Sequence, residues 1–134
     1  MAHDYARSFR MRGNDNGAKE MRTMQVSERM RQIQTMLQRE PDDPFLIYGL
    51  AMEFKKASAL NEALAAFDRV IAVDPAYCYA YFQKGQTLEL KGDSEAARKA
   101  YQAGIAAASG DAHAREELEG ALNMTWEGTK ARGT

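Results

Sequence analysis

Apolar residues recur along the chain at the spacing of an α-helix from about Val26 onward. The first stripe advances by four, three and four positions, through Val26, Met30, Ile33 and Leu37. This spacing places the four side chains on one face of a helix. Because Pro41 disfavours helical geometry in the residue before it, the pattern predicts a helix over 26–39 that ends near Arg39.

Further helices are predicted from the same kind of pattern. The segment from Pro44 to Lys56 is apolar on most sides and must be covered on more than one face; Asp43 is its expected N-cap. A helix follows the short joint at Ser58, and a second pair occupies much of 78–111, with Asp93 as a further N-cap. The last helix is predicted over 112–123. No segment alternates with period two, so the fold class is all-α.

The sequence matches itself when it is shifted so that Pro41 falls on Pro75. Small residues then fall on small ones and large apolar residues on large apolar ones. The other matched pairs are Phe45 and Tyr79, Ile47 and Tyr81, Tyr48 and Phe82, Phe54 and Leu88, Ser58 and Gly92, Ala63 and Ala97, Ala66 and Ala100, Phe67 and Tyr101, and Ile71 and Ile105. A fixed period of this kind is typical of stacked supersecondary units.

The distance from Pro41 to Pro75 is the period of the repeat. Two helices within a period of this length resemble the tetratricopeptide repeat. In the unit 44–77 the family pattern falls on Ile47, Leu50, Ala51, Phe54, Ala63, Phe67, Val70 and Pro75. In the unit 78–111 it falls on Tyr81, Lys84, Gly85, Leu88, Gly92, Ala97, Tyr101 and Gly104. Lys84, where an apolar residue is usual, and Ser109, where a proline is usual, depart from it. The resemblance implies a stack of antiparallel helical hairpins that forms a right-handed superhelix.

The resemblance also gives an expected domain organisation. The domain spans 25–124: helix 26–39 is the second half of a degenerate unit, and helix 112–123 is a terminal cap. Residues 1–24 are polar, contain several turn formers, and are expected to be a disordered arm or a leader. Residues 125–134 are expected to be a flexible tail, in which Trp126 is either an anchor folded back onto the stack or an exposed contact.

In this family the first helix of each unit lines a concave groove. The implied partner-binding residues are Phe45, Tyr48, Met52, Lys55, Tyr79, Phe82, Gln83 and Gln86, with Gly49 and Glu89 at neighbouring groove positions. An apolar, aromatic groove favours a peptide or helix of another protein as its ligand. Tyr48, Met52 and Gln83 stand where the family's clamp for a terminal carboxylate needs Lys, Asn and Arg, which argues against a chaperone-tail receptor.

The aromatic face could also be covered without a foreign partner. Helix 26–39, the terminal helix or the arm could cover it within one chain, and a homodimer could bury it between two copies. A secretion-type chaperone is a further alternative that only the small size of the chain favours.

Composition narrows the function classes. The 134 residues carry 18 basic and 19 acidic side chains, and this near balance predicts no nucleic-acid partner and no membrane partner. Cys78 is the single cysteine, which suits a reducing compartment and a cytoplasmic location. His3 and His113 lack partners at metal-ligand spacing, and phosphate-binding glycine motifs are absent. We therefore expect no metal, no cofactor, no catalytic residues and no enzymatic activity.

Overall fold

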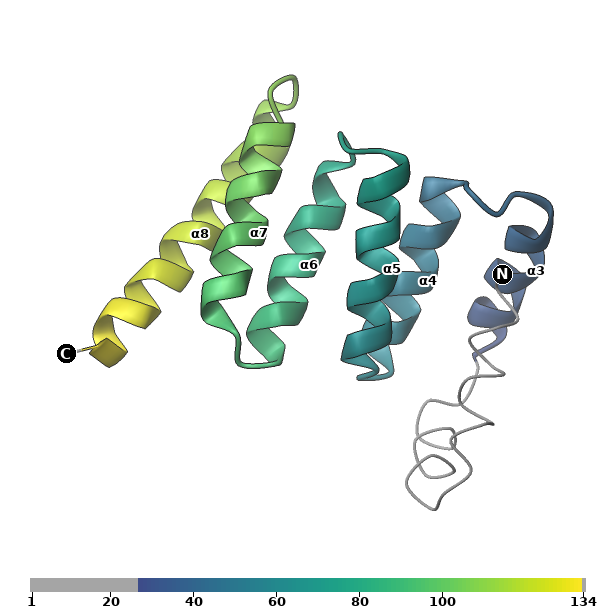
Figure 1. Cartoon of the computed structure of the whole chain (residues 1–134), viewed down its shortest axis with the longest axis horizontal. Helices are drawn as coiled ribbons and strands as arrows, with labels where there is room; N and C mark the ends of the chain where they lie inside the picture. Colours follow the sequence, from purple (N-terminus) through teal and green to yellow (C-terminus); the bar gives the residue numbers. More distant parts are fainter. Residues whose placement is uncertain (1–26, 134) are drawn as a thin grey trace, which may run out of the picture. The chain divides into compact units, whose positions relative to one another are not determined.

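The computed structural model describes residues 27–133, with side chains through residue 125 (Figure 1). Every regular element in that range is an α-helix, from α3 to α8, which confirms the all-α prediction. The chain divides into two compact units, Met1–Ala66 and Phe67–Thr134, and the boundary falls inside helix α5, Leu60–Val73. The predicted arm, 1–24, lies outside the described residues.

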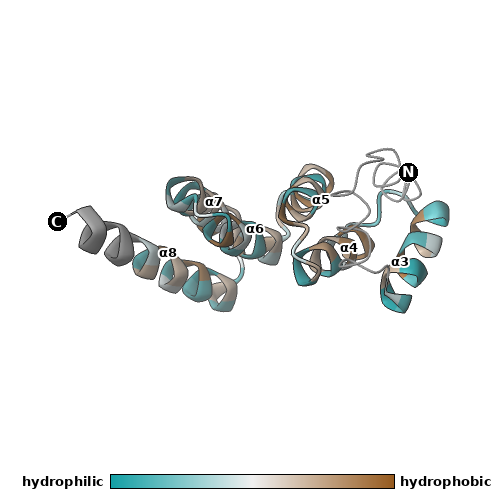
Figure 2. Ribbon diagram, turned by 90° about the horizontal axis from the view of Figure 1, so that it is seen from below, coloured by the Kyte–Doolittle hydropathy of each residue, from teal (hydrophilic) through white to brown (hydrophobic). Residues whose placement is uncertain are grey.

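The first unit contains α3, Glu28–Arg39, and α4, Pro44–Lys56. Helix α3 buries three members of the predicted stripe, Met30, Ile33 and Leu37, whereas the fourth, Val26, lies outside the described residues. Helix α4 buries residues on more than one face, and Figure 2 shows it as largely brown where α3 is mostly teal. The Asp43 carboxylate accepts hydrogen bonds from the backbone N–H groups of Phe45 and Leu46, at 2.9 and 3.3 Å, so the predicted N-cap is confirmed.

The second unit contains the end of α5 and helices α6, Cys78–Leu90, α7, Ser94–Ala107, and α8, Ala112–Gly133. Tyr101 of α7 is fully buried in the core of this unit. The core cluster consists of Cys78, Tyr81, Ala97, Tyr101, Ala108, Ala114 and Leu118. The Asp93 carboxylate accepts from the N–H of Ala96 at 3.1 Å, which confirms the second predicted N-cap.

The two turns that close the hairpins have the same hydrogen-bond pattern. The N–H of Ser58 donates to the backbone carbonyl of Lys55 at 3.0 Å, and the N–H of Ala59 donates to that of Phe54 at 2.9 Å. The N–H groups of Gly92 and Asp93 make the same two bonds at the matching positions of the next repeat. Both turns are Schellman motifs, in which the residue after the helix cap is left-handed. Ser58 has φ 61° and Gly92 has φ 87°, so the matched pair from the sequence shares an unusual backbone conformation.

The two departures from the repeat pattern leave the helices in register. Lys84 places its Nζ 2.7 Å from an Asp68 carboxylate oxygen, which accounts for a cation where an apolar residue is usual. Ser109 follows α7, which ends at Ala107, and that position matches the end of α5 at Val73 in the preceding repeat.

Two predicted helix boundaries are wrong. Helix α3 begins at Glu28 and not at 26, because Ser27 has an extended backbone and acts as the N-cap. Helix α8 does not end at 123: its backbone continues to Gly133, through the predicted tail 125–134. That segment contains no proline, and extending an existing helix needs little more than permissive residues. Thr125 fits this helix, since its hydroxyl donates to the Ala121 carbonyl at 2.9 Å. The predicted roles of Trp126 concern a side chain outside the described part.

Candidate partner-binding site

A pocket of about 210 Å³ lies within the first unit, between α3 and α4. It is mostly apolar. Its lining consists of Arg29, Gln32, Ile33 and Met36 from α3, and Phe45, Leu46, Tyr48, Gly49 and Met52 from α4. The helices that form it are consecutive and are joined by the connector 40–43.

Three predicted groove residues meet in this pocket: Phe45, Tyr48 and Met52. The Phe45 side chain is 69% exposed, whereas Tyr48 and Met52 are half-buried. Met36, which the groove prediction did not include, faces the same pocket from α3 and is 47% exposed. Lys55 does not line the pocket; it is half-buried, and desolvation lowers the pKa of its ammonium group.

Helix α3 forms one wall of the pocket and leaves its mouth open. The two helices approach closely at Gly49, where an added Cβ would lie 3.2 Å from Cδ1 of Ile33. This contact buries Ile33, yet it leaves the Phe45 side chain on the outside. The expectation that helix 26–39 could cover the groove is therefore not met at Phe45.

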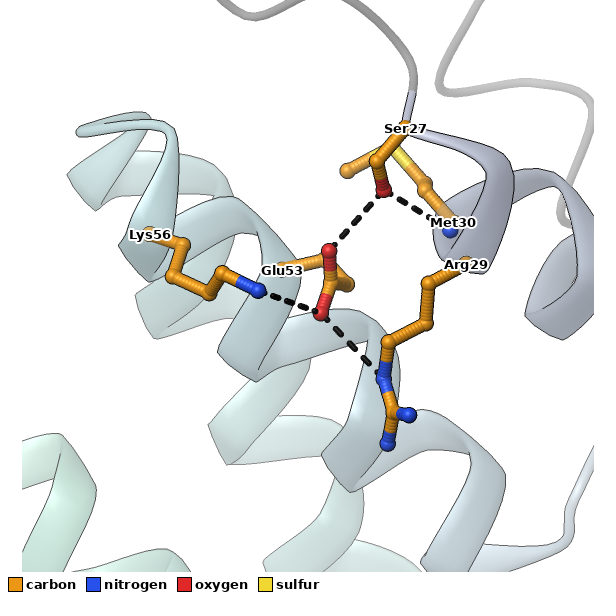
Figure 3. Close-up of polar contacts among 5 residues, drawn as sticks. All are labelled: Ser27, Arg29, Met30, Glu53 and Lys56. Atoms are coloured by element: carbon orange, nitrogen blue, oxygen red, sulfur yellow. Dashed lines mark hydrogen bonds and ion pairs between the residues drawn. The ribbon is translucent and has the colours of Figure 1, made fainter.

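A buried carboxylate, that of Glu53, holds the N-terminal end of α3 against α4. Glu53 of α4 is 5% exposed, and its Oε1 accepts a hydrogen bond from the Ser27 hydroxyl at 2.9 Å (Figure 3). Its Oε2 lies 3.3 Å from Nε of Arg29 and 3.6 Å from Nζ of Lys56. The Ser27 hydroxyl also accepts from the N–H of Met30 at 3.0 Å, as an N-cap does.

Sequence reasoning missed the Glu53 cluster, which consists of Glu53 and its partners Ser27, Arg29 and Lys56. A signal was present, because Glu53 is an acidic residue inside a helix that is apolar on most sides. A carboxylate in that position is buried only when cations and hydroxyl donors satisfy it. Which donors do so depends on α3, whose packing against α4 the hydrophobic pattern alone does not define.

The other four predicted residues lie on α6, in the second unit. Tyr79 is 38% exposed, and Gln83 and Gln86 are half-buried. Desolvation raises the pKa of Tyr79, and the charges of Glu117 and Asp111 raise it further. The ring of Phe82 packs against Tyr101, with centroids 6.1 Å apart and a tilt of 53°.

Phe82 therefore takes part in the core of its own unit. The first unit contains Tyr48 and Met52, whereas the second unit contains Gln83 and Gln86. Their membership in one continuous groove stays a prediction.

Among residues 27–125, no group of three His, Cys, Asp or Glu side chains is placed to hold a metal ion. Cys78 is buried, and desolvation raises the pKa of its thiol, which is the opposite of activation. His113 is exposed, with Nε2 3.0 Å from a Glu117 oxygen. No helix in the described part of the chain has the length and apolarity needed to cross a membrane.

The hairpins, their common register and their matching Schellman turns define a helical-repeat protein. A tetratricopeptide repeat family model matches residues 66–99. A solution structure of a tetratricopeptide repeat domain protein from Salinibacter ruber is 32% identical with a TM-score of 0.60, and the similarity covers 63% of this chain and 88% of that chain. This chain belongs to the tetratricopeptide repeat family.

Two further structures are similar. A crystal structure of a tetratricopeptide repeat domain protein from Salinibacter ruber is 31% identical with a TM-score of 0.59, over 63% of this chain and 97% of that chain. The crystal structure of MamA, at 18% identity and a TM-score of 0.56, shares the fold over 75% of this chain and 67% of that chain. No curated protein matches the chain. Tetratricopeptide repeat domains generally bind other proteins, and they are typically non-enzymatic scaffolds.

Proposed function

We propose that this chain binds a peptide or helix of another protein, and that the pocket between α3 and α4 receives apolar side chains of that partner. The observation that carries the proposal is the pair Phe45 and Met36, which are 69% and 47% exposed beside one pocket. Each apolar side chain that a partner buries there contributes about 1.5–3 kcal/mol before the costs of association. The predicted binding residues of α6 belong to the second unit and remain a separate prediction from the sequence.

Self-association is the alternative that the same exposed residues favour. A second copy of the chain would cover Phe45 and Met36 as well as a foreign peptide would. Sedimentation velocity over a wide concentration range separates the two, because a homodimer dissociates on dilution and a monomer does not change. A secretion-type chaperone and a cytoplasmic location remain predictions from the sequence.

A defined peptide library tests the proposal on the full chain. Its members are amphipathic helical peptides of about 12 residues, acetylated and amidated, with apolar anchors at helical spacing. We expect binders whose affinity falls about tenfold or more when Phe45 is changed to Ser, since an anchor contact of this size is worth more than about 1.4 kcal/mol.

The matched control is Leu90→Ser. Leu90 is 63% exposed and lies at the end of α6, away from the pocket residues in the chain. Its replacement removes an exposed apolar side chain of similar character and should change peptide affinity less than about twofold. Equal losses with Phe45→Ser and Leu90→Ser, or binding that survives both, would exclude the pocket as the site.

A further inference from the structure

We propose that the partner peptide carries an acidic side chain beside its apolar anchors, and that Arg29 binds this carboxylate. The inference rests on the proposed function and adds the chemistry of the partner. The proposed site differs from a clamp for a terminal carboxylate, because its cation, Arg29, lies on α3 and lines a pocket whose walls are mostly apolar.

Arg29 is the charged residue among those that line the pocket. The other lining residues are apolar side chains, Gly49, Tyr48 and Gln32. A peptide that fills the pocket with apolar groups therefore brings its neighbouring residues to this guanidinium. A carboxylate is the side chain that a guanidinium binds best, through two parallel hydrogen bonds.

The Glu53 cluster orients Arg29 without using its binding edge. Glu53 contacts Nε of Arg29 at 3.3 Å, and Figure 3 shows the terminal nitrogens of Arg29 directed away from that carboxylate. The Arg29 side chain is 67% exposed, so this edge is accessible. Because a guanidinium that is already held loses less freedom on binding, the arrangement favours capture of a second carboxylate.

The local charge also favours an acidic ligand. Arg29 and Lys56 both pair with the single carboxylate of Glu53, which leaves one positive charge in excess. The other oxygen of Glu53 accepts from the uncharged Ser27 hydroxyl. An acidic peptide residue at Arg29 therefore balances the excess charge of Arg29, Lys56 and Glu53, whereas a basic residue is repelled.

The spacing along α3 defines the sequence of the expected partner. Arg29 and Met36 are seven positions apart, two helical turns or about 10 Å. A partner helix lying along the pocket would place its acidic residue near Arg29 and its main anchor two turns away, near Met36 and Phe45. The expected pattern is one acidic residue with apolar residues three or four and seven positions from it.

The test uses the peptide library in matched sets. Each apolar sequence is made with Glu, Gln or Lys at the position two turns from the main anchor, with both ends blocked. Binding to the full chain is measured by fluorescence anisotropy. We expect the Glu version to bind about tenfold tighter than the Gln version, as for a charge-assisted hydrogen bond, and the Lys version to bind weakest.

Variants on α3 identify the responsible residue. Arg29→Gln should reduce the Glu preference to about one, and Arg29→Lys should keep part of it, because lysine has charge without the planar fork. Arg31→Gln is the matched control, since Arg31 is an exposed arginine of the same helix that does not line the pocket; it should leave the preference unchanged. Urea unfolding confirms that each variant is folded.

The outcomes separate the two proposals. If Glu and Gln peptides bind equally and Phe45→Ser weakens both, the role of Arg29 is wrong and the proposed function stands. If no peptide binds the full chain, both proposals fail. Binding that needs a free terminal carboxylate would overturn the side-chain assignment. A homodimer that Phe45→Ser dissociates, or peptide binding that appears only after residues 1–24 are removed, would make a second copy or the arm the occupant and overturn the inference.

Discussion

Gly85 of α6 lies directly against the ring of Tyr101 on α7, so closely that a Cβ at position 85 would overlap the ring. The ring is fully buried and its hydroxyl donates a hydrogen bond to Glu89, so any shift of the ring would disturb this bond and the packing around it. This contact sets how closely α6 and α7 approach each other, and it explains why the interior of α6 contains a glycine.

Replacing Gly85 with Ala should destabilise the protein by about 2 kcal/mol, because the overlap outweighs the better helix propensity of alanine. The measurement is urea unfolding followed by circular dichroism. Gly120→Ala in α8 is the matched control, since open space surrounds that position; it should stabilise by up to about 1 kcal/mol. Similar effects from both substitutions would show that the Tyr101 ring moves aside for the added Cβ.

The left-handed turn residues give a prediction of opposite sign in the two hairpins. Ser58→Gly should stabilise by about 1 kcal/mol, because glycine adopts a positive φ without the strain that a Cβ introduces. Gly92→Ser should destabilise by a similar amount. Thermal unfolding of both variants checks the pair. If Ser58→Gly were destabilising, the greater freedom of glycine in the unfolded chain would outweigh the relieved strain.

The environment of Tyr101 predicts a loss of stability at alkaline pH. Desolvation raises the pKa of its phenol far above the ordinary value near 10, and the hydrogen bond to Glu89 and its charge raise it further. The native state therefore keeps a proton that the unfolded state releases. The stabilisation is complete below about pH 10 and declines as the pH rises above it.

Tyr101→Phe should cost about 1 kcal/mol near pH 7, through the lost hydrogen bond. The difference from wild type should shrink above about pH 10 by up to about 1.4 kcal/mol per pH unit, because phenylalanine does not ionise. Urea unfolding between pH 8 and pH 11, at about half-unit steps, measures this difference. A difference that stays constant over the range would mean that Tyr101 ionises in the native state at its ordinary pKa.

Ser27 contributes two hydrogen bonds at the start of α3, one to Glu53 and one from the Met30 N–H. Ser27→Ala should destabilise by about 1–2 kcal/mol, the usual range for a lost N-cap. Thr35→Ala on the same helix is the control, because the Thr35 hydroxyl bonds the Arg31 carbonyl at an exposed site; it should change stability by less than about 0.5 kcal/mol. Equal effects would indicate that Ser27 does not hold α3.

Much of the fold followed from local sequence signals. The stripe that ends at Leu37 and the caps at Asp43 and Asp93 were predicted correctly, because helical spacing and capping act within a few residues. The match of Ser58 with Gly92 proved to be conformational as well. The end of α8 was mispredicted because helix propensity is a weak signal where no proline or cap is present.

The amino-acid pattern was enough to establish the all-helical class, the repeat period and the family resemblance, since these depend on spacing along one chain. The packing of α3 on α4 was needed to show that Met36 and Arg29 join Phe45 at one pocket, and that Glu53 is buried with Ser27 and two cations around it. Such contacts depend on how two helices are rotated against each other. Periodicity defines an apolar face, but not which side chain of another helix meets it.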